Sequence, residues 1–111
     1  MPYEFGDVIL VRFPFTSQTA FKQRPAVVVS SRAYNAARPD IVIMAITSQV
    51  RSIPGFGDIP IRDWQGANLL KQSAIKPVFA TVEQTMVIRN LGELQAQDQS
   101  ALRTALSTLL G

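Results

Sequence analysis

The sequence predicts a mainly β protein, a small curled antiparallel sheet with one helix at its C-terminal end. Short apolar runs rich in β-branched residues alternate with turns that contain Gly, Pro, Asn or Asp. From Asp98 onward the apolar residues instead recur at helical spacing. The 111 residues, 47% hydrophobic and 17% charged, suffice for one domain with a buried core, which we expect to span 1–111.

The first two strands are expected at residues 8–13 and 26–30. The turn Gly6-Asp7 precedes the first strand and Pro14 ends it, and a polar stretch at 16–23 then reads as a long loop. Arg24-Pro25 opens the second run, which is too short and too β-branched for a surface helix. We expect the second strand to be buried on both faces.

Residues 31–40 are expected to form a connection with one helical turn, followed by a strand at 41–46. A loop rich in Ser, Gly and Pro occupies 49–58. The strand predicted at 59–61 contains Pro60, which confines it to a sheet edge or a strand end.

The rest of the chain predicts three more strands and the final helix. A turn at 64–70 contains Trp64, which is expected in the core, and strands follow at 73–76, 79–83 and 86–90. Asp98 is expected as the helix N-cap. The apolar stripe that packs this helix on the sheet is Ala101, Leu102, Ala105, Leu106, Leu109 and Leu110.

The composition excludes several kinds of active site. The chain contains neither His nor Cys, so it lacks the commonest general base, the commonest metal ligand and any thiolate nucleophile. No spacing of acids suggests a metal site, and we expect neither a metal nor another cofactor. The N-terminus lacks a signal-peptide pattern, and no apolar stretch approaches the ~18 residues of a membrane span, so the expected location is cytoplasmic.

The remaining polar residues suit a substrate that supplies its own nucleophile. The formal charge of +3 is a weak indication of a polyanionic partner. RNA brings a 2′-hydroxyl, and its cleavage needs a proton acceptor, cations on the phosphorane and a proton donor for the leaving 5′-oxygen. Arg, Lys, Thr and Ser at strand ends permit this reaction without identifying it.

Several motifs, in order and in register along nearly the whole chain, carry a family resemblance. They are GDVILVRFPFT at 6–16, RPAVVVS at 24–30, YN at 34–35, ITS at 46–48, GDIPI at 57–61, LLKQS at 69–73 and LGEL at 91–94. In this pattern the chain resembles the PemK/MazF family of toxins from type II toxin–antitoxin systems.

The resemblance implies an SH3-like antiparallel barrel with a C-terminal helix, the fold shared by CcdB and PemK. It implies a homodimer that cleaves single-stranded RNA without metal, leaves a 2′,3′-cyclic phosphate or 3′-phosphate and a 5′-hydroxyl, and is blocked by a cognate antitoxin. Two alternatives stay open: a CcdB-like poison that grips gyrase, and an RNA-binding barrel without catalysis.

The resemblance also implies site residues. The family's Arg and Thr correspond to Arg24, which would hold the scissile phosphate and share in proton transfer, and Thr47, which would hydrogen-bond the phosphate or the 2′-hydroxyl. The expected RNA-binding residues are Phe15, Lys22, Ser48, Arg51 and Lys76. Phe15 could stack on a base or pack in the core, and Lys76 could be a phosphate contact or a solvated lysine.

The chain departs from the better-known relatives in two places. Some relatives carry a His in the first long loop, where this chain has residues 20–23 (AFKQ), and its Phe21 is either a lid or a dimer contact. Some carry an Arg and an Asp after the residue matching Ser73, whereas this chain has Lys76-Pro77-Val78. Lys76 could replace that Arg, but the general base is left unassigned.

Overall fold

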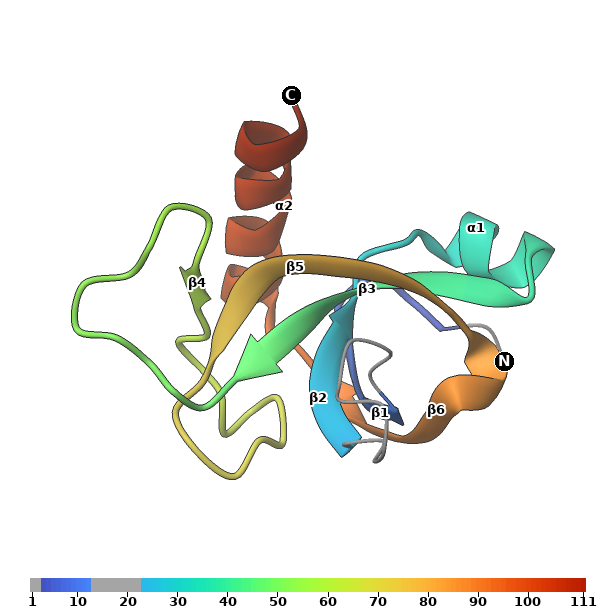
Figure 1. Ribbon diagram of the computed structural model, residues 1–111, viewed down its shortest axis with the longest axis horizontal. Coiled ribbons are helices and arrows are strands. Elements are labelled where there is room, and N and C mark those ends of the chain that lie inside the picture. The colour runs from blue at the N-terminus through green and yellow to red at the C-terminus, as the bar shows by residue number, and fades with distance from the viewer. Residues whose placement is uncertain (1–2, 13–22) are drawn as a thin grey trace, which may run out of the picture.

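The computed structural model describes residues 3–12 and 23–111 and has a sheet with helices on its outside (Figure 1). In chain order the elements are β1 (Asp7–Arg12), β2 (Gln23–Val28), α1 (Arg32–Ala37), β3 (Asp40–Thr47), β4 (Ile59–Pro60), β5 (Ala74–Glu83), the 3-10 turn η1 (Gln84–Met86), β6 (Val87–Glu93) and α2 (Ala96–Leu110).

The strands form one curled antiparallel sheet in the order β4-β5-β3-β2-β1-β6. This confirms the predicted fold class, although the strands described do not close into a full barrel because β4 and β6 remain unpaired edges. Pro60 lies in the edge strand β4, as its missing N–H requires.

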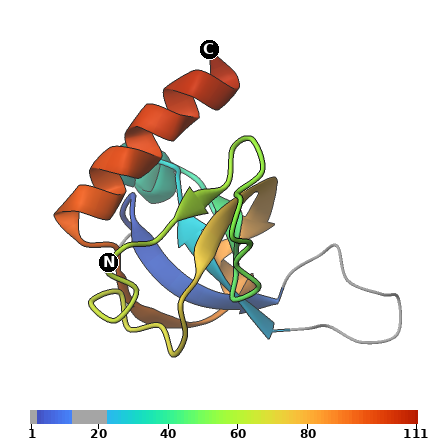
Figure 2. The same ribbon diagram turned by 90° about the vertical axis from the view of Figure 1, so that its left-hand side faces the viewer.

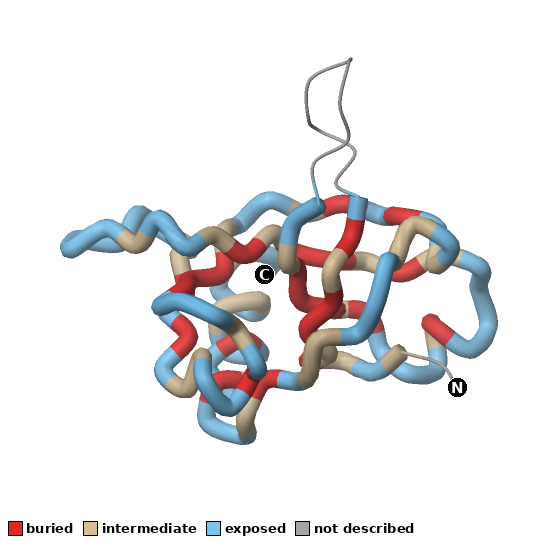
Figure 3. The backbone as a smooth tube through the Cα atoms, turned by 90° about the horizontal axis from the view of Figure 1, so that it is seen from below, coloured by how far each residue is buried: buried red, intermediate tan, exposed pale blue. Residues whose placement is uncertain are grey.

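Two apolar clusters fill the two faces of the sheet. The first includes Val27 and Met44, and α2 covers it with four residues of the predicted stripe, Leu102, Ala105, Leu106 and Leu109 (Figure 2). The prediction is wrong for Ala101 and Leu110, which are exposed because they lie on the outer side of the helix. The second includes Ala26 and Val28 and lies on the opposite face. Residues 26–28 of β2 are therefore buried on both faces, as predicted, and buried residues gather in the middle of the molecule (Figure 3).

Strand β5 differs from the prediction of two separate strands. It runs unbroken for ten residues, and the Pro77 that suggested a break lies at an irregularity. Met44 pairs with Phe79 and Ile46 with Ile75, so residues 76–78 face the single residue Ala45. This bulge accommodates Pro77, since a residue without an N–H cannot complete the ladder there.

The start of α2 also differs from the prediction. The helix begins at Ala96 with Gln95 as its N-cap, and Asp98 lies within the first turn. The Asp98 carboxylate is 2% exposed and accepts the backbone N–H groups of Arg62 and Asp63, each at 2.9 Å. A tertiary contact thus takes the carboxylate that local sequence assigns to capping.

Among the helices of residues 3–12 and 23–111, none has the length and apolar character of a membrane span.

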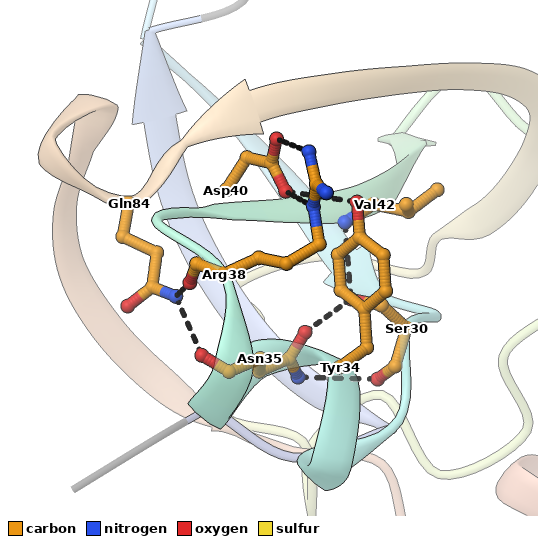
Figure 4. Close-up of polar contacts among 7 residues, drawn as sticks. All are labelled: Ser30, Tyr34, Asn35, Arg38, Asp40, Val42 and Gln84. Atoms are coloured by element: carbon orange, nitrogen blue, oxygen red, sulfur yellow. Dashed lines mark hydrogen bonds and ion pairs between the residues drawn. The ribbon is translucent and has the colours of Figure 1, made fainter.

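Helix α1 is anchored to the sheet through the buried Asn35 (Figure 4). Its Nδ2 donates to the carbonyls of Tyr3 at 2.8 Å and Ser30 at 3.2 Å, and its Oδ1 accepts from the Ser30 hydroxyl. Ser30 Oγ in turn accepts the Val42 N–H at 3.0 Å. The Asn35 carbonyl accepts from Gln84 Nε2 at 2.9 Å, which connects α1 to η1.

A charged cluster lies beside this network. Arg38 Nε donates to Asp40 Oδ1 at 3.0 Å and Nη2 to Oδ2 at 3.1 Å, while the Tyr34 hydroxyl donates to Oδ1 at 2.8 Å. These hydrogen bonds, above all those from Arg38, hold the pKa of Asp40 below its ordinary value. The cluster lies at the start of β3, at the opposite end of the strand from Thr47.

We predict that Asn35→Ala lowers the free energy of unfolding by about 2–4 kcal/mol, because it leaves the buried polar partners of the amide without hydrogen bonds. Urea denaturation at one fixed protein concentration measures the change. The exposed Gln72→Ala is the control and should change stability by less than ~0.5 kcal/mol. A loss below ~1 kcal/mol for Asn35→Ala would contradict the anchoring role.

Candidate functional site

The central strand β3 brings the two predicted catalytic residues to one end of the sheet. Ala26 of β2 pairs with Ala45 of β3. Arg24 lies two residues before Ala26 and Thr47 two residues after Ala45, so both lie beyond the same end of this antiparallel ladder. Side chains alternate faces along a strand, so both lie on the face of the second apolar cluster.

The other edge of β3 pairs with β5, which places Thr47 beside the start of that strand. Thr47 pairs with Ala74, and Ala74 pairs with Pro60 of β4. In Figure 1 the end of β3, the start of β5 and the loop leading to β4 lie on the same side of the molecule. A small recess opens between them, lined by Thr47, Gln49, Val50, Arg51, Pro54, Asp58, Pro60, Ala74 and Lys76.

The recess brings together three of the predicted site residues, Thr47, Arg51 and Lys76. Only about 10 Å³ of it is open to a water molecule, so it holds no nucleotide. A substrate would lie across its mouth and present single atoms to the residues inside.

The Thr47 hydroxyl is held in place by the backbone. Its Oγ1 accepts the N–H of Gln49 at 3.1 Å. A hydroxyl that accepts one hydrogen bond keeps its own hydrogen for donation. Thr47 therefore offers an oriented hydrogen-bond donor.

Three cations lie on the segments near Thr47: Arg51 and Lys76 line the same recess, and Arg24 belongs to the neighbouring strand β2. Arg24 is exposed, and within residues 3–12 and 23–111 its side chain makes no hydrogen bond or ion pair. Arg51 is also exposed. The Lys76 side chain is 34% exposed, and its Nζ lies 3.6 Å from Asp58 Oδ1. An uncommitted guanidinium can bind two oxygens of one phosphate through its planar fork.

Asp58 is the site residue that the sequence analysis missed. It follows a tight turn in which its N–H donates to the Gly55 carbonyl at 3.0 Å, while the Gly55 N–H donates to its Oδ2 at 2.9 Å. Gly57, third in this turn, has a φ of 88°, which favours glycine. The signal was the Gly-Asp pair closing a loop just before an edge strand, and only the fold shows which side chains it meets.

Of the other predicted RNA contacts, the structure describes only Ser48. Ser48 is exposed beside Thr47 and does not line the recess. Phe15 and Lys22, with the undecided Phe21, lie outside the described residues. The loop after β3 offers one aromatic group that the prediction did not include, since Phe56 is 82% exposed.

The described part of the chain contains no group of three acidic side chains that could hold a metal ion. What the recess assembles is one hydroxyl donor, one carboxylate and two cations, with Arg24 on the neighbouring strand. Such a set can bind a phosphodiester and move protons near it.

A larger and more open hollow lies elsewhere, at the start of α2. It is lined by Glu93, Leu94, Gln95, Ala96, Gln99, Ser100 and Arg103. Its one cation is already engaged, because the Arg103 guanidinium lies 4.0 Å from the centre of the Phe5 ring. The chemistry of the smaller recess makes it the better candidate.

A family model described as "PemK-like, MazF-like toxin of type II toxin-antitoxin system" matches residues 4–110. No curated protein matches the chain at the sequence level. Solved structures share the fold. An endoribonuclease from Mycobacterial species has a TM-score of 0.77 at 22% identity, covering 100% of this chain and 93% of its own.

Two further structures match comparably. A MazE-MazF complex from Deinococcus radiodurans has a TM-score of 0.77 at 22% identity, covering 100% of this chain and 98% of the other. The Mycobacterium tuberculosis toxin MazF-mt6 has a TM-score of 0.75 at 18% identity, covering 94% and 95%. At these identities the structural matches establish the fold.

We predict that Gly57→Ala disturbs the turn that holds Asp58. An added Cβ would meet Leu109 Cδ2 at 2.9 Å, and the positive φ costs a residue with a side chain about 1–2 kcal/mol. Hydrogen exchange measured by NMR should show faster exchange of the Gly55 and Asp58 amides. Ser52→Ala, at an exposed position in the same loop, should leave both unchanged. Equal protection in the Gly57 variant and the parent would contradict the turn's role.

Proposed function

This chain belongs to the PemK-like, MazF-like family of toxins of type II toxin–antitoxin systems, and we propose that it is an endoribonuclease acting on single-stranded RNA. The 2′-hydroxyl of the substrate attacks the adjacent phosphate, which yields a 2′,3′-cyclic phosphate and a 5′-hydroxyl. The observation that carries this proposal is the placement of Arg24 and Thr47 by β3, with Lys76 in the recess beside Thr47.

Each of these residues has a role that its geometry supports. Arg24 binds the non-bridging oxygens of the scissile phosphate, and its fork stabilises the charge that they gain in the transition state. Thr47 donates its free hydroxyl hydrogen to a phosphate oxygen or to the 2′-oxygen. Arg51 contacts the RNA backbone at the mouth of the recess.

The residue types favour a nucleophile that comes with the substrate. A hydrolase that activates water typically uses a His or a bound metal, and this chain has neither His nor Cys. Internal attack needs only proton transfer and charge stabilisation, which Arg, Lys, Thr and a carboxylate supply. The same feature favours RNA over DNA, since DNA lacks the 2′-hydroxyl.

The proposed partners are an antitoxin and a second copy of the chain. Structural neighbours include an endoribonuclease in complex with its cognate antitoxin and MazE-MazF complexes. An acidic, partly apolar antitoxin tail could cover the cations around Thr47 and exclude RNA. The described sheet has unpaired edges, and apolar side chains such as Ile88 of β6 are exposed, this one to 40%; both features support a homodimer. The proposed location is the cytoplasm, where RNA and antitoxin are available.

The first prediction from the proposed function concerns the metal requirement and the products. Cleavage of a mixed-sequence single-stranded RNA should persist in excess EDTA, because no proposed step uses a metal ion. End-group analysis should find 5′-hydroxyls opposite 2′,3′-cyclic or 3′-phosphates. Either 5′-phosphate products or loss of cleavage on chelation would count decisively against internal attack.

The second prediction concerns Arg24 and Thr47. Arg24→Ala should slow the chemical step by a hundredfold or more, about 3 kcal/mol, with a much smaller effect on RNA binding. Arg24→Lys should restore little, because an ammonium is not a planar fork. Thr47→Ala should be slow, whereas Thr47→Ser keeps the hydroxyl and much of the rate.

Single-turnover kinetics and RNA binding, measured separately, check this prediction. A folded Arg24→Ala variant that still cuts RNA within about tenfold of the parent would refute the role of Arg24. A chain whose parent form binds RNA without cutting it would instead be the non-catalytic RNA-binding barrel.

The third prediction concerns assembly. Light scattering at micromolar concentration should give twice the chain mass of 12.2 kDa. A peptide corresponding to the antitoxin tail should compete with RNA, because both occupy the cations beside Thr47. A monomer would refute the dimer, and full cleavage in the antitoxin complex would refute shared occupancy.

A further inference from the structure

The proposed reaction leaves two roles without a residue, the group that removes the proton from the 2′-hydroxyl and the group that gives a proton to the leaving 5′-oxygen. Arg24, Arg51 and Lys76 are cations at neutral pH and cannot accept a proton. The Thr47 hydroxyl is held as a donor. A proton acceptor must lie within hydrogen-bonding distance of the 2′-oxygen, at the mouth of the same recess.

Asp58 is the one acid among the described residues that line the recess. Its neighbours there include Thr47 and Lys76, from the end of β3 and the first part of β5. The loop after β3 therefore returns a carboxylate to the place where the strands bring a hydroxyl and an ammonium. The segment around Lys76, Pro77 and Val78 supplies no acid of its own.

The carboxylate is held in position but keeps room to accept a proton. Oδ2 accepts the Gly55 N–H at 2.9 Å, and Oδ1 lies 3.6 Å from Lys76 Nζ. Each oxygen of a carboxylate has two acceptor sites, so one remains on each. The side chain is 11% exposed, enough for contact with a single hydroxyl at the mouth.

The turn and the edge strand fix where this carboxylate lies. Ile59, next in the chain, pairs with Ile75 of β5, one residue before Lys76. Gly57 lies so close to Leu109 of α2 that an added Cβ would be 2.9 Å from its Cδ2. Asp58 is thus held between the helix and β5, and its approach to Lys76 follows from both contacts.

We propose that Asp58 and Lys76 are the proton acceptor and the proton donor of the cleavage reaction, an inference that rests on the proposed function. The 2′-O–H bond breaks as its proton moves to a carboxylate oxygen of Asp58, and the freed oxygen bonds to phosphorus. The bond from phosphorus to the 5′-oxygen breaks, and that oxygen takes a proton from the Lys76 ammonium.

The pair restores itself after each cut. The step leaves a carboxylic acid on Asp58 and a neutral amine on Lys76, and transfer of one proton between them regenerates the ion pair. Arg24 keeps its proton throughout and stabilises charge. No co-reactant is needed, and the overall reaction conserves protons.

A pair of RNA substrates separates the two roles. The first is a short single-stranded RNA that the parent cuts, and the second is the same RNA with sulfur in place of the leaving 5′-oxygen. A thiolate departs without a proton, so the second substrate needs the acceptor but not the donor. Single-turnover rates are measured for the parent, Asp58→Asn, Lys76→Met and the control Asp63→Asn.

Asp58→Asn should lose about a hundredfold or more in rate on both substrates, the usual effect of removing a general base. Its amide oxygen can still accept the Gly55 N–H. Lys76→Met should lose similarly on the oxygen substrate and recover to within about threefold of the parent on the sulfur substrate. Asp63 accepts a glycine N–H in the same manner, from Gly66 at 2.9 Å, but lies outside the recess, so Asp63→Asn should cleave like the parent.

Each contrary result has one meaning. A parent that cleaves while Asp58→Asn stays within about threefold of it overturns the acceptor role and leaves the proposed function standing. Lys76→Met equally slow on both substrates overturns the donor role. A parent that does not cleave RNA overturns the proposed function itself.

A second variant guards against a merely structural effect at Asp58. Asp58→Ala removes the carboxylate, and added formate can enter the space and accept the proton. Cleavage should rise in formate relative to chloride at equal ionic strength. Equal rates in the two buffers would contradict the proposal, because a carboxylate returned to the site would then not restore the proton transfer.

Discussion

The two hydrogen-bonded ladders of β3 are the constraint on which the site depends. One ladder sets the end of β2, and with it Arg24, beside the end of β3. The other sets Ala74, and two residues later Lys76, beside Thr47. Because a one-residue slip turns every side chain of a strand to the other face, either ladder out of register would separate these groups and expose a core. The apolar clusters on both faces of the sheet hold that register.

This arrangement explains how a chain without His or Cys could carry the proposed chemistry. Each element supplies one simple group: Thr47 comes from the end of β3, Lys76 from β5 and Arg24 from β2. The carboxylate comes from a loop, which is a less rigid support than a strand. The position of this carboxylate is fixed by the turn at 55–58, by the ion pair with Lys76 and by the contact of Gly57 with Leu109 of α2.

Much of the fold could be predicted because the same local pattern of apolar residues governs both burial and strand formation. The β-branched runs located β1, β2 and β3, Pro60 placed β4 at an edge, and the helical stripe located α2. The errors lie where distant contacts override local preference, as for Pro77 in a bulge of β5 and Asp98 bound to the amides of 62 and 63. The family resemblance assigns roles to Arg24 and Thr47 but none to Asp58. The proposed role of Asp58 depends on neighbours 11 and 18 positions away, which only the fold brings together.

In the proposed mechanism the RNA itself supplies the nucleophile, while the protein supplies protons and charge. The most direct test is an RNA oligonucleotide that the protein cuts at one position, with a single 2′-deoxy nucleotide on the 5′ side of that bond. We expect this substrate to bind as well as the parent RNA and to remain uncut, while cuts elsewhere in the strand continue. Cleavage at the 2′-deoxy position would mean that water attacks the phosphate, which would contradict the proposed mechanism.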